Sequence, residues 1–435
     1  MQTVLIIAIF VVMVVLMYTK KLSAMFALPV MAFLIALVAG IPLMDRVLED
    51  GTTEAGILNL MFVNGPQRLA SSIFMVIYGA ILSQIVRQSG IAETVIRKVS
   101  ELAGDRPLVL GIAFFLVLSV LFVSLGGLGS VMMIGTIVLP IMTSAGLSPL
   151  AAGCILLFAL STGGIFNIAN WGLYISALGL TVEEIRSFAY FLGAIFVIIG
   201  IAFVVIETKR GGKLFRKVKT SNWAVSSSSN REEVKNVPWY VLITPVIPVV
   251  LVLAFNIDIN TAFVVAILYG FLTTLHKGAL NDLTKCVTQG ISDSAGAIFL
   301  MVGIGQLLLV VMDARVTAFI GPQLSAIMPT HPITYILFFT ILAPLALYRG
   351  PFNVWGLGLG IGAVMLTTGR LPAMAIMAAL MSTGQLQGIC DPTNTHNVWT
   401  AAATQVDVND ILKKTLPYVW AGAFIGLAVA GFMYL

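Results

Sequence analysis

Two stretches of this 435-residue chain follow the same pattern, GLSPLAAGCILLFALSTGG at residues 146–164 and GRLPAMAIMAALMSTGQ at residues 369–385. In each stretch a glycine stands three positions before a proline, and the apolar run after the proline ends in Ser-Thr-Gly. Glycine and proline are frequent in membrane helices, so one such match alone would carry little weight. Because all three signals recur in the same order, we interpret the chain as an internal duplication.

The residues on either side of these stretches support the duplication. Upstream, the Gly-rich segment 124–129 has a counterpart at residues 348–353, and downstream the polar segment 167–171 corresponds to 391–399. The duplication predicts five parts: an N-terminal helix pair with an external loop, a first repeat, a basic linker, a connecting helix pair and a second repeat. Their expected bounds are 1–70, 71–206, 207–237, 238–290 and 291–435.

The composition indicates that lipid is the solvent of this chain. Hydrophobic residues make up 59% of it and charged residues 10%, and the mean hydropathy is +1.02, which leaves too little polar surface for a water-soluble protein. Apolar stretches long enough to span about 30 Å of hydrocarbon as a helix recur along the sequence. The expected fold is therefore an all-α polytopic membrane protein with about 10–12 transmembrane helices, some of them broken.

The basic residues orient the chain in the membrane. Residues 207–236 hold eight of the 24 lysines and arginines, and cytoplasmic loops normally collect such residues. We therefore expect a multi-pass protein of the inner cell membrane, with the linker in the cytoplasm and the N-terminus outside. On this orientation the first repeat starts outside near Ser71 and the second starts inside near Asp293, so the two copies are inverted. The first apolar segment lacks the features of a cleaved signal peptide and is expected to remain as a membrane helix.

Other classes of function are disfavoured. The net charge of +5 comes from loops between spans and does not indicate nucleic-acid binding, and the three cysteines show neither disulfide nor metal spacing. No His-Glu-x-x-His or Gly-x-Ser-x-Gly motif is present, so we expect neither an enzyme nor a cofactor. A channel is disfavoured because two half-sites that close around a solute leave no continuous pore.

Four polar interruptions of the apolar runs, at 124–130, 161–170, 349–353 and 382–397, are the expected walls of a solute site. Backbone that leaves the helix inside a membrane must be satisfied by protein or by a water-lined cavity, and paired helix ends offer N–H groups to an anion. The simpler interpretation is that the glycines only allow close helix packing. The symmetric recurrence favours a site, and the predicted solute-binding residues are Ser124, Gly126, Gly127, Ser161, Thr162, Asn167, Asn170, Arg349, Asn353, Ser382, Thr383, Gln385, Asn394 and Thr395.

Ionisable side chains inside a membrane are costly and point to function. We expect Arg349 to anchor a carboxylate, because its planar guanidinium can bind one bidentately. Alternatively, Arg349 marks a helix end or pairs with Asp391. The expected site of a coupling Na⁺ or proton comprises Asp391, Thr393 and His396, unless Asp391 only caps a helix.

In organisation the chain resembles the ion transporter superfamily and, within it, citrate permeases of the citrate-metal:proton type and gluconate permeases. The segment 167–172 is similar to the break that ends in Trp-Gly in citrate permeases, and 391–395 is similar to the Ser-Asn-Thr signature with which related dicarboxylate carriers bind Na⁺ and carboxylate. The resemblance implies re-entrant hairpins at the repeat tips, a homodimer and an elevator movement of the site domain. Segment 124–130 carries no Asp, unlike the citrate permease motif, which weakens the expectation of a citrate-metal complex.

The predicted function is secondary active transport of a small organic anion, such as a di- or tricarboxylate or a sugar acid, coupled to H⁺ or Na⁺. The expected partners are that anion, the lipid bilayer and a second copy of the chain. The alternative is a cation/proton antiporter, in which Asp391 would exchange the ions and Arg349 would have a structural role.

Overall fold

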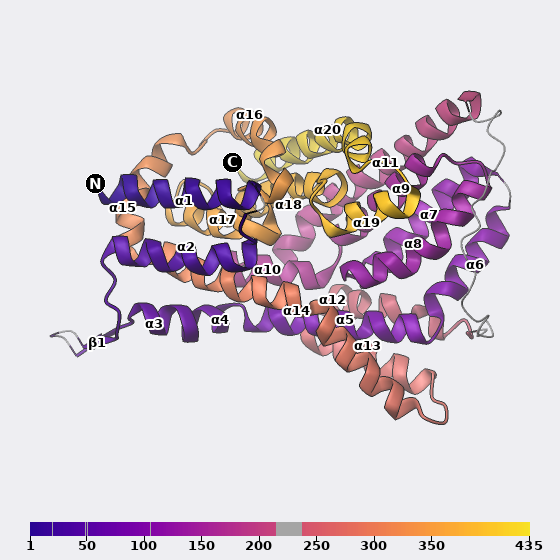
Figure 1. Cartoon of the computed structure of the whole chain (residues 1–435), viewed down its shortest axis with the longest axis horizontal. Coiled ribbons are helices and arrows are strands. Elements are labelled where there is room, and N and C mark those ends of the chain that lie inside the picture. Colours follow the sequence, from indigo (N-terminus) through magenta and orange to yellow (C-terminus); the bar gives the residue numbers. More distant parts are fainter. Residues whose placement is uncertain (20, 48, 50, 105, 215–236) are drawn as a thin grey trace.

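The computed structural model describes every residue except 20, 48, 50, 105 and 215–236, so most of the predicted basic linker lies outside the described residues. The chain is an all-α polytopic membrane protein in which many helices run along the longest axis of the molecule (Figure 1). Within the described part, six helices are long and apolar enough to cross a membrane, or up to eight if each of two bent pairs is one span. The predicted 10–12 spans also counted apolar helices of 10–17 residues, which here form hairpin arms and shorter elements.

The N-terminal part is a pair of apolar helices followed by a small β-ladder and three short helical turns. Asp45 fastens this loop, because its carboxylate accepts hydrogen bonds from the Gly56 N–H and the Asn59 side-chain amide, both at 2.8 Å. The elements are α1 (Gln2–Tyr18), α2 (Ala24–Ala39), β1 (Arg46–Val47), β2 (Thr53–Glu54), α3 (Ile57–Asn59), the π-helical η1 (Leu60–Asn64) and α4 (Gly65–Arg68).

The first repeat begins with a long helix and continues through an amphipathic helix, a helical hairpin, a broken helix and a closing helix. The two halves of the broken helix meet at an angle of 50°. The elements are α5 (Ala70–Gln88), α6 (Ile91–Ala103), the hairpin arms α7 (Pro107–Phe122) and α8 (Gly127–Ser144), the broken pair α9 (Pro149–Ile165) and α10 (Ile168–Leu178), and α11 (Val182–Leu214). The connecting elements are η3 (Val241–Val246), α12 (Ile247–Phe255) and α13 (Ile259–Thr273).

The second repeat presents the same kinds of element in the same order. Its long helix already begins at Ala279, so the predicted boundary at residue 291 falls inside a continuous helix. The elements are α14 (Ala279–Met312), α15 (Ala314–Ile327), the hairpin segments α16 (Pro332–Leu342), η4 (Ala343–Arg349), η5 (Val354–Gly358) and α17 (Leu359–Thr367), the broken pair α18 (Ala373–Cys390) and α19 (Thr395–Thr404), and α20 (Val408–Tyr434).

The segment that ends in α5 and helix α14 cross in an antiparallel pair with an approximate two-fold relation. A Cβ added to Gly290 of α14 would lie 2.9 Å from the Ile81 Cα, and one added to Gly65 would lie 2.9 Å from the Gln306 Cα. The two contacts are equivalent in the duplication, because Gly65 and Gly290 are 225 positions apart and so are Ile81 and Gln306. An inverted duplication produces such a reciprocal crossing. In each half a glycine lets the backbone of the other half approach closely.

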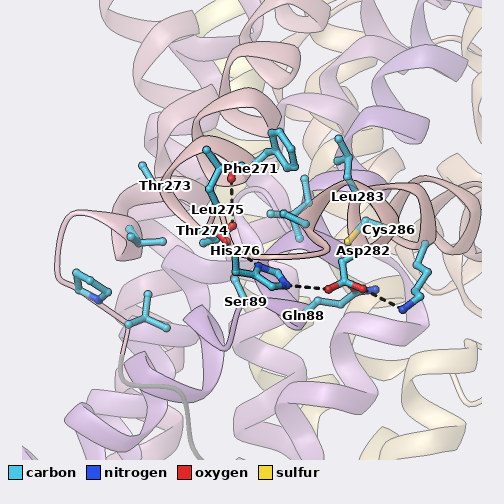
Figure 2. A pocket seen from close by; sticks show the side chains of 16 residues that line it. Gln88, Ser89, Phe271, Thr273, Thr274, Leu275, His276, Asp282, Leu283 and Cys286 are labelled. Carbon is cyan, nitrogen blue, oxygen red and sulfur yellow. Dashed lines mark hydrogen bonds and ion pairs between the residues drawn. The ribbon is translucent and has the colours of Figure 1, made fainter.

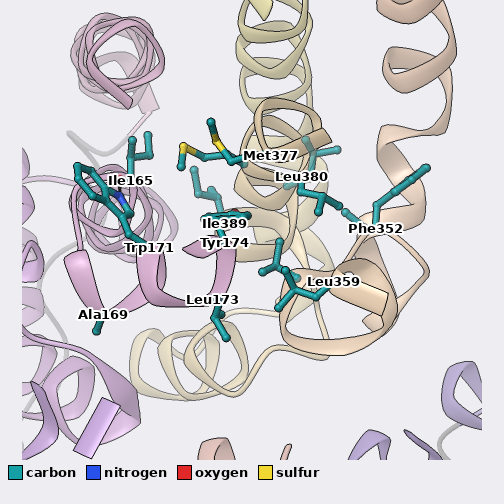
Figure 3. Close-up of a cluster of buried hydrophobic side chains, with 14 of the residues drawn as sticks. Ile165, Ala169, Trp171, Leu173, Tyr174, Phe352, Leu359, Met377, Leu380 and Ile389 are labelled. Carbon is teal, nitrogen blue, oxygen red and sulfur yellow. Dashed lines mark hydrogen bonds between the residues drawn. The ribbon is translucent and has the colours of Figure 1, made fainter. Parts of the chain in front are cut away.

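A buried apolar cluster holds the two repeats together beside the breaks. Figure 3 shows Trp171 and Leu173 of the first repeat gathered with Leu359 and Leu380 of the second. All four side chains are fully buried or nearly so. Truncating a large buried side chain typically costs about 2–5 kcal/mol, so this cluster contributes to the stability of the contact between the repeats.

Candidate functional site

All four predicted interruptions border one cavity of about 820 Å³ between the repeats. The first repeat contributes the tip of the α7–α8 hairpin and the α9–α10 break, and the second contributes residues 353–355 and the α18–α19 break. Helices α5 and α14 and the turn between α1 and α2 complete the wall. Segments from both halves of the sequence therefore share one cavity.

Most of the predicted site residues line this cavity. Ser161 and Gln385 meet across the repeat boundary, where the Ser161 hydroxyl donates to the Gln385 side-chain oxygen at 2.7 Å. Gly388 permits this approach, because a Cβ there would lie 2.5 Å from the Ser161 Oγ. The predicted residues in the lining are Ser124, Gly126, Gly127, Ser161, Asn167, Asn170, Asn353, Gln385, Asp391, Asn394, Thr395 and His396.

Three predicted residues of the Ser-Thr-Gly signatures are absent from the lining of this cavity, so their role in solute binding stays a prediction. Helix α9 remains helical to Ile165 and α18 to Cys390, so the signatures are helical and present one face only. On α18 the cavity is lined by Met381, Gly384, Gln385, Gln387 and Gly388, and all of these except Gln387 follow the spacing of one helix face. Thr162, Ser382 and Thr383 point to other sides and are buried in the interior.

Two more predicted site residues are not among the described lining residues of the cavity. Thr393 supports Asp391 and is not part of the lining. Arg349 ends η4, but its side chain lies outside the described residues, so its role as a carboxylate anchor stays a prediction.

The first break is fixed by side chains that bind the backbone released there. Asn167 caps α10 by accepting from the Ala169 N–H at 3.1 Å, and its amide donates to the Phe122 carbonyl at 3.2 Å. The buried Trp171 indole donates to the Ile165 carbonyl at 2.8 Å. These bonds satisfy carbonyls at two helix ends, which otherwise would be unpaired at membrane depth.

At the second break an asparagine side chain again binds backbone of the preceding helix, and a carboxylate lies next to it. Asn170, inside α10, and Asn394, the N-cap of α19, make similar contacts, because each donates to a carbonyl near the end of the preceding helix, Gly164 at 3.1 Å and Gln387 at 3.2 Å. Asp391 is 1% exposed, and its Oδ1 accepts from the Thr393 N–H and hydroxyl at 2.8 and 2.7 Å. The other carboxylate oxygen, Oδ2, has no hydrogen-bond partner among the residues that the structure describes. A buried carboxylate oxygen without a partner is costly, and a cation or a proton would satisfy it.

The cavity combines carboxylates with helix N-termini. Among its described lining residues are Asp293, Asp391 and His396, with no Lys or Arg in that set. Helices α8, α10 and α19 begin at the cavity, with Gly126, Asn167 and Asn394 as their N-caps. These ends carry partial positive charge and attract anions, so the site offers features for both a cation and an anion. Within the described residues, no group of three His, Cys, Asp or Glu side chains is placed to bind a metal ion.

Sequence reasoning missed Ser83 and Asp293 in the lining. Both lie within long continuous helices, α5 and α14, which no interruption marks. For Asp293 a signal was available, because a carboxylate within an apolar span is a candidate functional residue by itself.

A second cavity, of about 460 Å³, lies at the turn between α13 and α14 (Figure 2). There the His276 ring contacts Asp282 at 3.0 Å, and Lys285 contacts the same carboxylate at 2.9 Å. The described lining residues of this cavity and of the larger one do not overlap. Its polar groups pair with one another, so the larger cavity is the candidate functional site.

Comparison with known proteins identifies the fold. No family model and no curated protein matches the sequence. The YdaH transporter of Alcanivorax borkumensis matches with a TM-score of 0.59 and 13% identity, over 99% of this chain and 98% of that one. MtrF of Neisseria gonorrhoeae, described in connection with antimetabolite efflux pumps, matches with a TM-score of 0.59 and 13% identity, over 94% of each chain. The chain thus has the fold of two membrane transporters, and the matches do not support the narrower resemblance to citrate and gluconate permeases.

Proposed function

We propose that this protein is a secondary transporter that carries a small organic anion across the cell membrane, coupled to H⁺ or Na⁺. The observation that carries the proposal is that both hairpins and both broken helices, drawn from the two repeats, border one cavity. Discontinuous helices around a shared site are the usual architecture of secondary transporters. A cavity of about 820 Å³ accommodates a small solute together with water.

The anion is assigned to the helix N-termini of the site. The N-cap of α8 is Gly126, which has no side chain to satisfy the free N–H groups of the first turn. A carboxylate placed there would accept hydrogen bonds from the backbone and interact with the positive end of the helix. Arg349 is retained as a further anchor, at the end of η4 in the second hairpin.

The coupling ion is assigned to the second break. Asp391 lines the cavity, and its Oδ2 has no partner within the described part of the chain, which favours Na⁺ or a proton at this position. The movement that exposes the site to each side is proposed to be of the elevator type, and the functional unit is proposed to be a homodimer. The same carboxylate supports the second candidate, a cation/proton antiporter, in which no organic solute would be transported.

Uptake of radiolabelled carboxylates into proteoliposomes tests the proposal. Imposed gradients of Na⁺ or of pH are expected to drive concentrative uptake of at least one di- or tricarboxylate or sugar acid. Cation exchange without uptake of any of these anions would favour the antiporter instead.

Replacement of Arg349 with Ala is expected to lower the initial uptake rate about tenfold or more, because a bidentate charge-assisted contact contributes about 1.5–3 kcal/mol. The matched control is Arg370→Ala, because Arg370 is exposed in the turn before α18. Normal uptake by Arg349→Ala would remove Arg349 from the site and leave the helix N-termini as the anion anchor.

A further inference from the structure

The tip of the first hairpin is fastened to the α5–α14 pair by side chains that border the cavity. The Ser83 hydroxyl of α5 contacts the Ser130 hydroxyl of α8. Ser130 also donates to the Gly126 carbonyl at 2.8 Å, so it binds the hairpin tip and α5 at once. Both ends of this link face the solute cavity, because Ser83 and Gly126 are part of its lining.

A carboxylate lies beside this link. The Gln84 amide of α5 donates to Asp293 Oδ2, and the Gln289 amide donates to Asp293 Oδ1 at 2.7 Å. Asp293 Oδ2 also faces Gly129 in the first turn of α8, where an added Cβ would lie 3.0 Å from it. The negative charge of Asp293 therefore stands next to the N-terminus of α8, where it interacts favourably with the helix dipole.

The arrangement differs from ordinary packing between membrane helices. Apolar side chains would suffice to hold α8 to α5, yet the contact joins the buried hydroxyls of Ser83 and Ser130, beside Asp293, which is exposed in the cavity wall. Polar contacts at a cavity wall can exchange their partners for water, so they can open and close repeatedly. The first turn of α8 is thus held by the buried contact between Ser83 and Ser130, and it lies beside the exposed carboxylate of Asp293 at the cavity wall.

We propose that Ser83, Gln84, Ser130 and Asp293 form a hairpin latch, in which Asp293 is the positioning residue that holds the α8 N-terminus at the cavity. The latch must open in each transport cycle. This inference rests on the proposed transport function and adds the element that controls access to the site.

The first experiment uses the Ser83→Cys/Ser130→Cys double variant. Serine hydroxyls in direct contact leave their Cβ atoms near the separation of about 3.5–4.5 Å that a disulfide requires. Oxidation is expected to lower uptake into proteoliposomes more than tenfold, and a reductant is expected to restore it. Wild-type protein treated with the same oxidant is the control, because Cys154, Cys286 and Cys390 are buried. Equal uptake by the oxidised and reduced double variant would overturn the latch.

The second experiment needs no known solute. The variant Leu128→Cys places a thiol in the cavity wall near the hairpin tip. Its rate of alkylation by a small maleimide reports the opening of the latch. Asp293→Asn keeps the shape of the side chain and removes its charge, and it is expected to raise this rate about tenfold. Asp293→Glu is expected to restore the slow rate at least in part. An unchanged rate in Asp293→Asn would overturn the latch even if no transported anion is found, whereas failure to find one while the rate rises counts only against the proposed function.

Discussion

Asparagine in place of Asp391 is expected to abolish concentrative uptake, with the initial rate roughly 30- to 150-fold lower than in the wild type. This range corresponds to the loss of a charge-assisted contact of about 2–3 kcal/mol. Proteoliposomes loaded with buffer and exposed to a labelled anion under a Na⁺ or pH gradient provide the measurement. Counterflow, which needs no net coupling, is expected to fall less than gradient-driven uptake.

The geometry explains why this substitution is informative. Asp391 Oδ1 organises the turn by accepting two bonds from Thr393, and an asparagine oxygen can accept the same bonds. The change therefore acts at Oδ2, which is buried and meets no hydrogen-bond partner among the described side chains and backbone. If Asp391 only shaped the turn, asparagine would transport normally.

A matched control separates charge from general damage. Asp407→Asn removes one negative charge from an exposed N-cap of α20, where Asp407 accepts from the Asn409 N–H at 2.7 Å. Asparagine is also a good N-cap, so this variant is expected to transport at the wild-type rate. Normal gradient-driven uptake by Asp391→Asn would contradict the coupling role.

The largest effect on stability is expected from Gly305→Ala in α14. A Cβ at this position would lie 2.1 Å from the Gly65 carbonyl oxygen and 2.9 Å from the Gly65 carbonyl carbon. The obstacle is backbone, which cannot rotate away as a side chain would, so the α4–α14 crossing must separate. Overpacking of a core typically costs about 1–3 kcal/mol, and we expect a cost at or above the upper end of this range.

Thermal unfolding in detergent, followed by tryptophan fluorescence, measures this prediction. Gly296→Ala is the control within the same helix, because an added Cβ there meets no atom within 4 Å. The control is expected to unfold at the wild-type temperature, although Gly296 borders the cavity and its transport can change. Equal midpoints for the two variants would show that the crossing adjusts more readily than the close contact at Gly65 implies.

The sequence predicted the all-α class and the approximate places of the breaks. These features depend on local chemistry: long apolar runs require lipid, and clusters of glycine, asparagine and threonine interrupt them. Asn170 and Asn394 lie in the segments that the duplication paired, and in the structure each donates to a carbonyl of the preceding helix, a contact that the sequence did not predict. The roles of these residues in transport remain predictions.

The local sequence pattern did not show which face of each helix meets the cavity. Thr162, Ser382 and Thr383 stand beside cavity-lining residues in the sequence yet point elsewhere, because α9 and α18 stay helical through their Ser-Thr-Gly signatures. A rotation of about 100° per residue separates Ser161 from Thr162, so only the packing of the helix decides which of the two meets the solute.

The sequence by itself thus determined that this chain is a membrane protein, predicted a duplication and located the main breaks in its helices. Only the tertiary structure decided which side chains share the cavity. Ser83 and Asp293 lie on uninterrupted helices, and they reach the hairpin tip at Ser130 and Gly129 through the crossing of α5 and α14. The physical reason is that such contacts join residues far apart in the chain, and they depend on helix approach and rotation, which no local sequence pattern encodes.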